Sequence, residues 1–142
     1  MKRLSWLLII SALVGLLSLA SCKKTNRGDL NSSIEQAISM LEAKQYKEFL
    51  QEFFNPEEMA NALKRQSLDN LAGEFSKSKA GLLLGVLKRI KGRQPQYSSD
   101  QTEARFSLAS DTDLPVDPDP TARDINYIAF KKVNGVWYIK NR

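Results

Sequence analysis

Cys22 is the residue of this chain best placed to undergo covalent chemistry, because it is the single cysteine among 142 residues and it ends a distinctive leader. A basic start at residues 2 and 3 leads into an apolar run from Leu4 to Ala20. A leucine and two small residues, at positions 19–21, directly precede the thiol. This succession is the layout of a secretory signal peptide. The pattern predicts a signal peptide over residues 1–21, with Cys22 as the first residue of the mature chain.

The four residues Leu19-Ala20-Ser21-Cys22 resemble the lipobox of bacterial lipoproteins. The resemblance implies that Cys22 is lipidated, with diacylglycerol and N-acyl chains of the palmitate type. It also implies that the protein is held on a membrane of the bacterial cell envelope, at the periplasmic or extracellular face. Two alternatives stay open. One is an uncleaved transmembrane anchor, since an apolar run of roughly 17 residues is barely long enough to span a bilayer. The other is an ordinary signal peptide followed by an incidental cysteine.

The composition of the mature chain excludes several kinds of site. The chain has no histidine, which removes histidine-based metal sites and the usual general base. After lipidation of Cys22 no free thiol remains for a disulfide or for thiolate chemistry. Removing the leader takes two of the 21 basic residues and leaves 19 against 16 acidic residues, a net charge of +3. We therefore expect no cofactor and no nucleic-acid partner, which would need a dense basic face.

Two groups of carboxylates remain as candidates for chemistry. The first is an acidic loop with hard oxygen ligands of the kind that suits Ca²⁺, namely Asp111, Asp113, Asp117 and Asp119. This loop lacks the sixth-position glycine and the distal glutamate of an EF-hand, so we interpret it as solvated and expect no metal. The second group could meet a tyrosine in a pocket for acid–base catalysis. No spacing singles out a pair among Asp69, Glu74 and Asp124 with Tyr46, Tyr127 and Tyr138.

The segment from Ser76 to Tyr97 carries cations and no acid, namely Lys77, Lys79, Lys88, Arg89, Lys91 and Arg93. Around residues 82–87 it resembles a basic amphipathic helix, which on a lipid-anchored protein could rest on anionic headgroups. The favoured interpretation is a core helix with a solvated basic face, whose cations near the C-terminus suit the helix dipole.

The element that follows Cys22 is polar and lacks apolar periodicity, which predicts a flexible tether over residues 22–31. The folded domain is expected to span residues 32–142. Ser32 or Ser33 is the expected N-cap of its first helix. Apolar residues at helical spacing then continue beyond a break near residues 43–45.

Two further helix starts are marked by capping residues. Asn55 is followed by Pro56, a favourable pair for an N-cap and a first helical turn. Ser67 is expected to cap a longer helical stretch that reaches Ile90, bent or weakened at Gly81 and Gly85. The residues expected on the buried faces of these helices are Met59, Ala60 and Leu63, followed by Leu68, Leu71, Phe75, Leu82, Val86 and Ile90.

Strands are predicted after residue 94. Residues 94–98 are a short possible strand, and residues 102–109 alternate as a half-buried strand does. Asn134-Gly135 is the preferred pair for a two-residue hairpin turn, because both positions need positive φ. It joins the strands expected over 124–133 and 136–140. This turn pairs residue 133 with 136, and it places Ile128, Phe130, Trp137 and Ile139 on the core face, with Tyr127, Ala129, Lys131, Tyr138 and Lys140 on the other.

Helices first and antiparallel strands last predict an α+β domain, with N-terminal helices packed on a curved antiparallel sheet. Residues 41–50, LEAKQYKEFL, resemble the opening helix–break–helix of the nuclear transport factor 2-like superfamily. Residues 125–140 resemble its closing hairpin. The resemblance implies a cone-shaped sheet closed by helices around an internal pocket. It indicates the fold more strongly than the function.

With no catalytic residue assigned, we expect a non-catalytic module that binds a small apolar ligand or an envelope protein. The residues expected to line its pocket are Tyr46, Phe49, Phe53, Phe106, Phe130 and Trp137. One alternative is a small isomerase- or lyase-type enzyme that uses Asp or Glu with Tyr in the cone pocket. Another is an assembly subunit that dimerises through the sheet face around Tyr127 and Tyr138.

Overall fold

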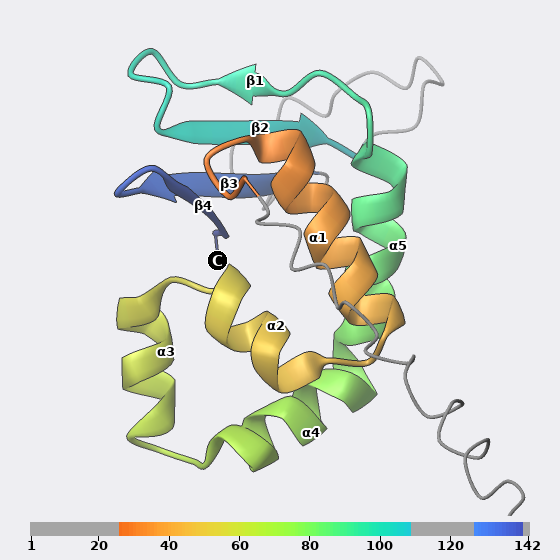
Figure 1. Cartoon of the computed structure of the whole chain (residues 1–142), viewed down its shortest axis with the longest axis vertical. Helices are drawn as coiled ribbons and strands as arrows, with labels where there is room; N and C mark the ends of the chain where they lie inside the picture. Colours follow the sequence, from red (N-terminus) through yellow and green to blue (C-terminus); the bar gives the residue numbers. More distant parts are fainter. Residues whose placement is uncertain (1–25, 109–126, 141–142) are drawn as a thin grey trace, which may run out of the picture.

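The computed structural model describes residues 26–108 and 127–140, and in these residues five helices are followed by a four-stranded antiparallel sheet (Figure 1). The expected α+β class is confirmed. The leader, Cys22, the acidic loop at 111–119 and Asp124 lie outside the described residues. The helices are α1 (Leu30–Glu42), α2 (Tyr46–Phe53), α3 (Pro56–Leu63), α4 (Leu68–Ser78) and α5 (Ala80–Ile90). The strands are β1 (Gln96–Tyr97), β2 (Glu103–Ser107), β3 (Tyr127–Val133) and β4 (Val136–Ile139).

The first helix starts earlier than the sequence predicted. Asp29 is its N-cap, and the Asp29 Oδ2 atom accepts a hydrogen bond from the backbone N–H of Ser32 at 2.7 Å. The prediction of Ser32 or Ser33 as the cap was therefore wrong. Leu30 explains the difference. Its side chain is buried, so an earlier start of the helix adds apolar contacts with the core. Ser33 is fully buried, and its hydroxyl donates to the carbonyl oxygen of Asp29 at 2.8 Å.

The two other predicted caps are confirmed. The Asn55 Oδ1 atom accepts a hydrogen bond from the N–H of Glu57 at 2.9 Å, with Pro56 in the first turn of α3. The Ser67 hydroxyl accepts from the N–H of Asn70 at 3.3 Å at the start of α4. The break between α1 and α2 also lies where it was expected, and Lys44 adopts a positive φ of 58° there.

The stretch from Ser67 to Ile90 is two helices rather than one. It divides at Lys79, the residue between α4 and α5, whose φ and ψ are −123° and −29°. The division changes the helical phase, so Leu82 is 76% exposed instead of buried. Ala60 and Leu63 of α3 are also exposed, because this short helix buries only Met59.

The sheet has the order β1-β2-β3-β4, and every neighbouring pair is antiparallel. The predicted hairpin register is confirmed: Val133 pairs with Val136 and Lys132 with Trp137. The turn residues Asn134 and Gly135 have φ of 50° and 80°, as a type I′ turn requires. A slip of one residue would exchange the two faces of the hairpin, so burial of Trp137 fixes this register.

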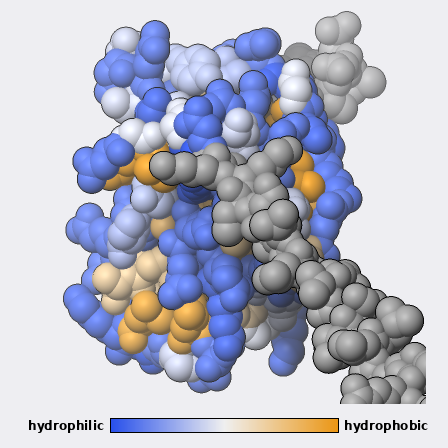
Figure 2. Space-filling view, in the orientation of Figure 1, coloured by the Kyte–Doolittle hydropathy of each residue, from blue (hydrophilic) through white to orange (hydrophobic). Residues whose placement is uncertain are grey.

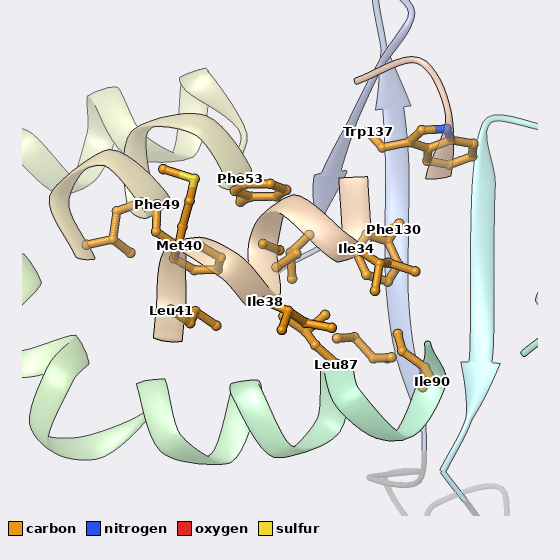
Figure 3. Close-up of a cluster of buried hydrophobic side chains, with 14 of the residues drawn as sticks. Ile34, Ile38, Met40, Leu41, Phe49, Phe53, Leu87, Ile90, Phe130 and Trp137 are labelled. Carbon is orange, nitrogen blue, oxygen red and sulfur yellow. The ribbon is translucent and has the colours of Figure 1, made fainter. Parts of the chain in front are cut away.

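The core lies where α1 meets α5, α2 and the sheet. Figure 3 shows Ile34 of α1 beside Phe130 of β3, and Ile38 of α1 beside Leu87 of α5. Phe54, just after α2, forms a parallel bridge with Ile139 of β4. The helices α3 and α4 lie at the end of the molecule opposite the sheet (Figure 1).

Candidate functional site

The six residues expected to line a pocket lie in the packed interior instead of around one shared hollow. Five of them, Phe49, Phe53, Phe106, Phe130 and Trp137, are at most 4% exposed, and Tyr46 packs against the same core. The rings form separate pairs. Phe49 stacks on Phe53 with centroids 5.1 Å apart, and Phe106 meets Phe130 edge-on at 5.9 Å. These side chains contact one another, as expected of a close-packed core.

Two hollows formed by the described residues lie elsewhere, between α2, α3 and α4. One has a volume of about 180 Å³ and an apolar floor formed mainly by Leu50, Phe54, Met59, Leu71 and Phe75. The other has a volume of about 430 Å³ and lies along the far part of α3. The two share Glu58, Ala62 and Leu71 in their walls, so they form one continuous feature, which we call the α3 groove.

The α3 groove exists because α3 is poorly buried. It is an eight-residue helix held to the core by Met59, which is 7% exposed. The apolar side chain of Leu63, at its end, is 42% exposed. Apolar surface is visible over α3 and the start of α4 in Figure 2. An apolar hollow with exposed apolar residues beside it is typical of an interaction site.

Aromatic packing makes the floor of the α3 groove rigid. Phe75 of α4 stacks on Phe49 at 5.5 Å and meets Phe54 edge-on at 6.2 Å. Tyr46 contacts Phe75 edge-on at 6.1 Å. Offset and edge-on rings at these distances are favourable arrangements. The floor is thus preformed.

Charged groups stand at the lip of the α3 groove. Glu58 lines both hollows, and it forms no ion pair with any residue of 26–108 or 127–140. Glu74 accepts a hydrogen bond from the Gln66 amide at 3.2 Å. Lys79 and Arg65 lie on the walls as well. No motif or spacing in the sequence predicted this site. The surplus of apolar residues on a short helix, Leu63 among them, was the one signal that pointed to it.

Asp69 and Glu74, the two candidate catalytic carboxylates that the structure describes, are not arranged for acid–base chemistry. Asp69 is 73% exposed in its side chain and forms an ion pair with Lys47, which raises the pKa of that lysine. Glu74 is exposed and bonded to Gln66. Among residues 26–108 and 127–140, no three His, Cys, Asp or Glu side chains gather where they could hold a metal ion. Catalysis needs a positioned acid or base whose pKa suits its task, and neither exposed carboxylate is so placed.

The basic segment around α5 belongs to a core helix. Leu87 and Ile90 are fully buried, while Lys88 pairs with Glu42 at 2.6 Å and Lys91 with Glu35 at 3.3 Å. Arg89 donates to the carbonyl oxygen of Leu108 at 2.9 Å. Acids of α1 therefore offset two of its cations, which favours the solvated basic face over a surface for lipid headgroups.

Tyr127 and Tyr138 lie on the sheet face opposite the core, and both are half-buried. The guanidinium of Arg105 lies 5.4 Å from the centroid of the Tyr127 ring. This face is more polar than the α3 groove, since Glu103, Arg105 and Lys140 form ion pairs across it.

Comparison with known proteins identifies no relative: no family model, no curated protein and no solved structure matches this chain. Within the part of the chain that the structure describes, no helix is both long and apolar enough to cross a membrane.

Proposed function

We propose that this chain is a lipid-anchored protein of the bacterial cell envelope whose domain binds a protein partner in the α3 groove. The lipobox-like sequence at residues 19–22 supports the anchor. The mature domain would then stand on the periplasmic or extracellular face of a membrane. The observation that carries the binding function is the α3 groove itself, a preformed apolar hollow. Asp69 and Glu74, the two candidate catalytic carboxylates that the structure describes, are both exposed.

The walls of the α3 groove indicate the chemistry of the partner. Its floor is aromatic and aliphatic, and it runs beside a helix, which suits apolar side chains from an amphipathic segment. Glu58, which has no ion-pair partner in the described residues, lies in the wall shared by both hollows. A lysine or arginine next to the apolar residues of the partner would pair with this carboxylate. The fit is therefore to an amphipathic segment that carries a lysine or arginine opposite Glu58.

Membership of the nuclear transport factor 2-like superfamily is part of the same proposal. It is supported by α1 and α2 with their short break, followed by an antiparallel meander that ends in a hairpin. In this proposal the binding site is the α3 groove and not the interior of the cone, since the aromatic residues expected there are packed against one another.

A defined probe tests the groove. An amphipathic helical peptide of leucine and lysine is titrated into the isotope-labelled mature protein, and backbone amide shifts are followed by NMR. We expect shifts confined to α2, α3 and α4. Ala62→Trp fills the groove and should abolish them, whereas Ala60→Trp, an equal change at an exposed position of the same helix outside the lining, should not. Shifts on the sheet, or equal binding by both variants, would contradict the proposal.

A further inference from the structure

The chain enters the folded domain along the free edge of β4. The backbone N–H of Trp137 donates to the carbonyl oxygen of Arg27 at 3.1 Å, and its indole Nε1 donates to that of Gly28 at 3.1 Å. A Cβ atom at Gly28 would lie only 3.2 Å from the carbonyl oxygen of Gly135. Residues 26–31 are thus part of the folded domain, which corrects the expectation of a tether over residues 22–31.

This arrangement leaves a very short connection between the lipid and the domain. Three residues, 23–25, lie between Cys22 and Asn26, the first described residue, so four residue-to-residue steps join them. A chain of that length spans at most about 14 Å. If Cys22 carries acyl chains, as the proposed function requires, the surface around Trp137 must lie close to the lipid headgroups. The same constraint does not hold for α3 and α4, at the other end of the molecule (Figure 1).

The side chains around Trp137 suit a headgroup layer. The Tyr97 ring is 52% exposed and lies tilted against Trp137, with centroids 6.3 Å apart. The Lys132 ammonium is 5.3 Å from the centroid of the Trp137 ring. Exposed tyrosines are favoured at membrane–water interfaces, and each cation near an anionic surface is attracted by about 1 kcal/mol.

We propose that the surface formed by Tyr97 and Lys132, beside the buried Trp137, faces the membrane and that these two side chains contact anionic lipid headgroups. This inference rests on the proposed lipid anchor and adds to it a fixed orientation of the domain. The domain would stand on its sheet end, with α3 and α4 more distant from the bilayer.

Trp137 is itself the reporter for the test. The chain has two tryptophans, Trp6 in the leader and Trp137, so the mature protein keeps only Trp137. Lipidated full-length protein is reconstituted into vesicles of phosphatidylcholine and phosphatidylglycerol that carry a dansyl-labelled headgroup lipid. Energy transfer from tryptophan to dansyl is then measured. We expect efficient transfer from Trp137. A protein carrying Trp137→Phe and Leu82→Trp places the donor at an exposed site on α5 and should transfer much less.

Lys132→Glu and Lys131→Glu form the matched pair, because these neighbours lie on opposite faces of β3. Lys132→Glu should lower the transfer from Trp137 on anionic vesicles, whereas Lys131→Glu should leave it unchanged. A separate flotation assay with the same vesicles measures whether the protein is bound to the membrane, and so tests the anchor. Protein that fails to float refutes the anchor, and with it the proposed function. Protein that floats but shows equal transfer from both donor positions, or an equal effect of the two charge reversals, refutes the orientation alone.

Discussion

Arg27 and Trp137 form a reciprocal pair of hydrogen bonds: the N–H of Trp137 donates to the carbonyl oxygen of Arg27 at 3.1 Å, and the Arg27 guanidinium donates to that of Trp137 at 2.8 Å. The same guanidinium donates to the carbonyl oxygen of Glu52 at 2.6 Å and lies 3.7 Å from the centroid of the Phe53 ring. Burial lowers the pKa of Arg27, and the nearby Glu52 partly offsets this effect. Arg27 therefore covers the outer edge of β4 at Trp137, where unpaired backbone groups could otherwise bind another chain. It also joins this edge to α2, and Phe54 pairs with Ile139 farther along it.

Arg27→Ala should lower the free energy of unfolding by about 2–3 kcal/mol, because it removes two hydrogen bonds from a charged donor and a cation–π contact. Arg27→Lys should recover only part of this loss, since an ammonium lacks the planar fork of the guanidinium. Urea unfolding of the unlipidated mature chain measures the change. Arg93→Ala, at an exposed position, should cost less than about 0.5 kcal/mol. Equal effects of Arg27→Ala and Arg93→Ala would contradict the structural role of Arg27.

Two glycine substitutions should change stability in opposite directions. Gly135 has a φ of +80° in the β3–β4 turn, so Gly135→Ala should destabilise the protein by about 1 kcal/mol. Gly85 is exposed on α5, and a Cβ there meets nothing within 4 Å. Gly85→Ala should therefore stabilise the protein by about 0.5–1 kcal/mol. Thermal unfolding measures the change in melting temperature for each variant. Destabilisation by Gly85→Ala would be inconsistent with an open, helical environment at this position.

Asp100 should contribute to stability above about pH 4 and lose that contribution on acidification. Its carboxylate accepts hydrogen bonds from the Ser98 hydroxyl at 2.6 Å and from the N–H and hydroxyl of Thr102 at 3.1 and 2.9 Å. These bonds lower the pKa of Asp100 to about 2, against about 3.9 in an unfolded chain. Because the pKa of Asp100 is lower in the folded state, its contribution to the free energy of unfolding is complete above the unfolded pKa of about 3.9. This contribution disappears as the pH falls through the folded pKa of about 2.

Asp100→Asn should accordingly lower the melting temperature at pH 7, and its difference from the unchanged protein should shrink between about pH 4 and pH 2. Ser98→Ala, which removes the largest cause of the shift, should reduce the same pH dependence. A difference that stays constant with pH would show that the ionised carboxylate of Asp100 is not the stabilising group.

The helix α3 should open locally before the rest of the domain. It is held to the core chiefly by Met59, whereas α1 buries seven residues. Few buried apolar contacts lower the free energy of local opening. Amide hydrogen exchange should therefore be faster in α3 than in α1, and Met59→Ala should accelerate it in α3 alone. Uniform acceleration across all helices would show that α3 opens only when the whole domain unfolds.

The hairpin was predictable because two local signals agree there. Asn134-Gly135 specifies the turn, and the alternation of Phe130 and Lys131 on one strand with Trp137 and Tyr138 on the other specifies the faces. Capping signals were just as informative at Asn55 and Ser67. At the start of α1, however, three possible caps compete, and burial of Leu30 decides in favour of Asp29.

The α3 groove could not be predicted from local sequence patterns, because it depends on how the helices are oriented relative to one another. Whether Leu63 and Leu82 are buried is set by the angle at which each helix leaves its neighbour, and a change of direction at Lys79 rotated Leu82 into solvent. The same limit applies to the expected pocket. A stripe of aromatic residues indicates a buried surface, but only the packing of Phe49, Phe53 and Phe106 shows that the space between them is filled.

The proposed anchor and the proposed orientation both depend on lipidation of Cys22, which intact mass spectrometry of the protein purified from bacterial membranes detects. We expect a mature chain that begins at residue 22 and carries the added mass of diacylglycerol and an N-acyl chain, together with loss of this form in Cys22→Ser. A membrane-bound protein that retains residues 1–21, or a mature chain with an unmodified Cys22 thiol, would contradict the account.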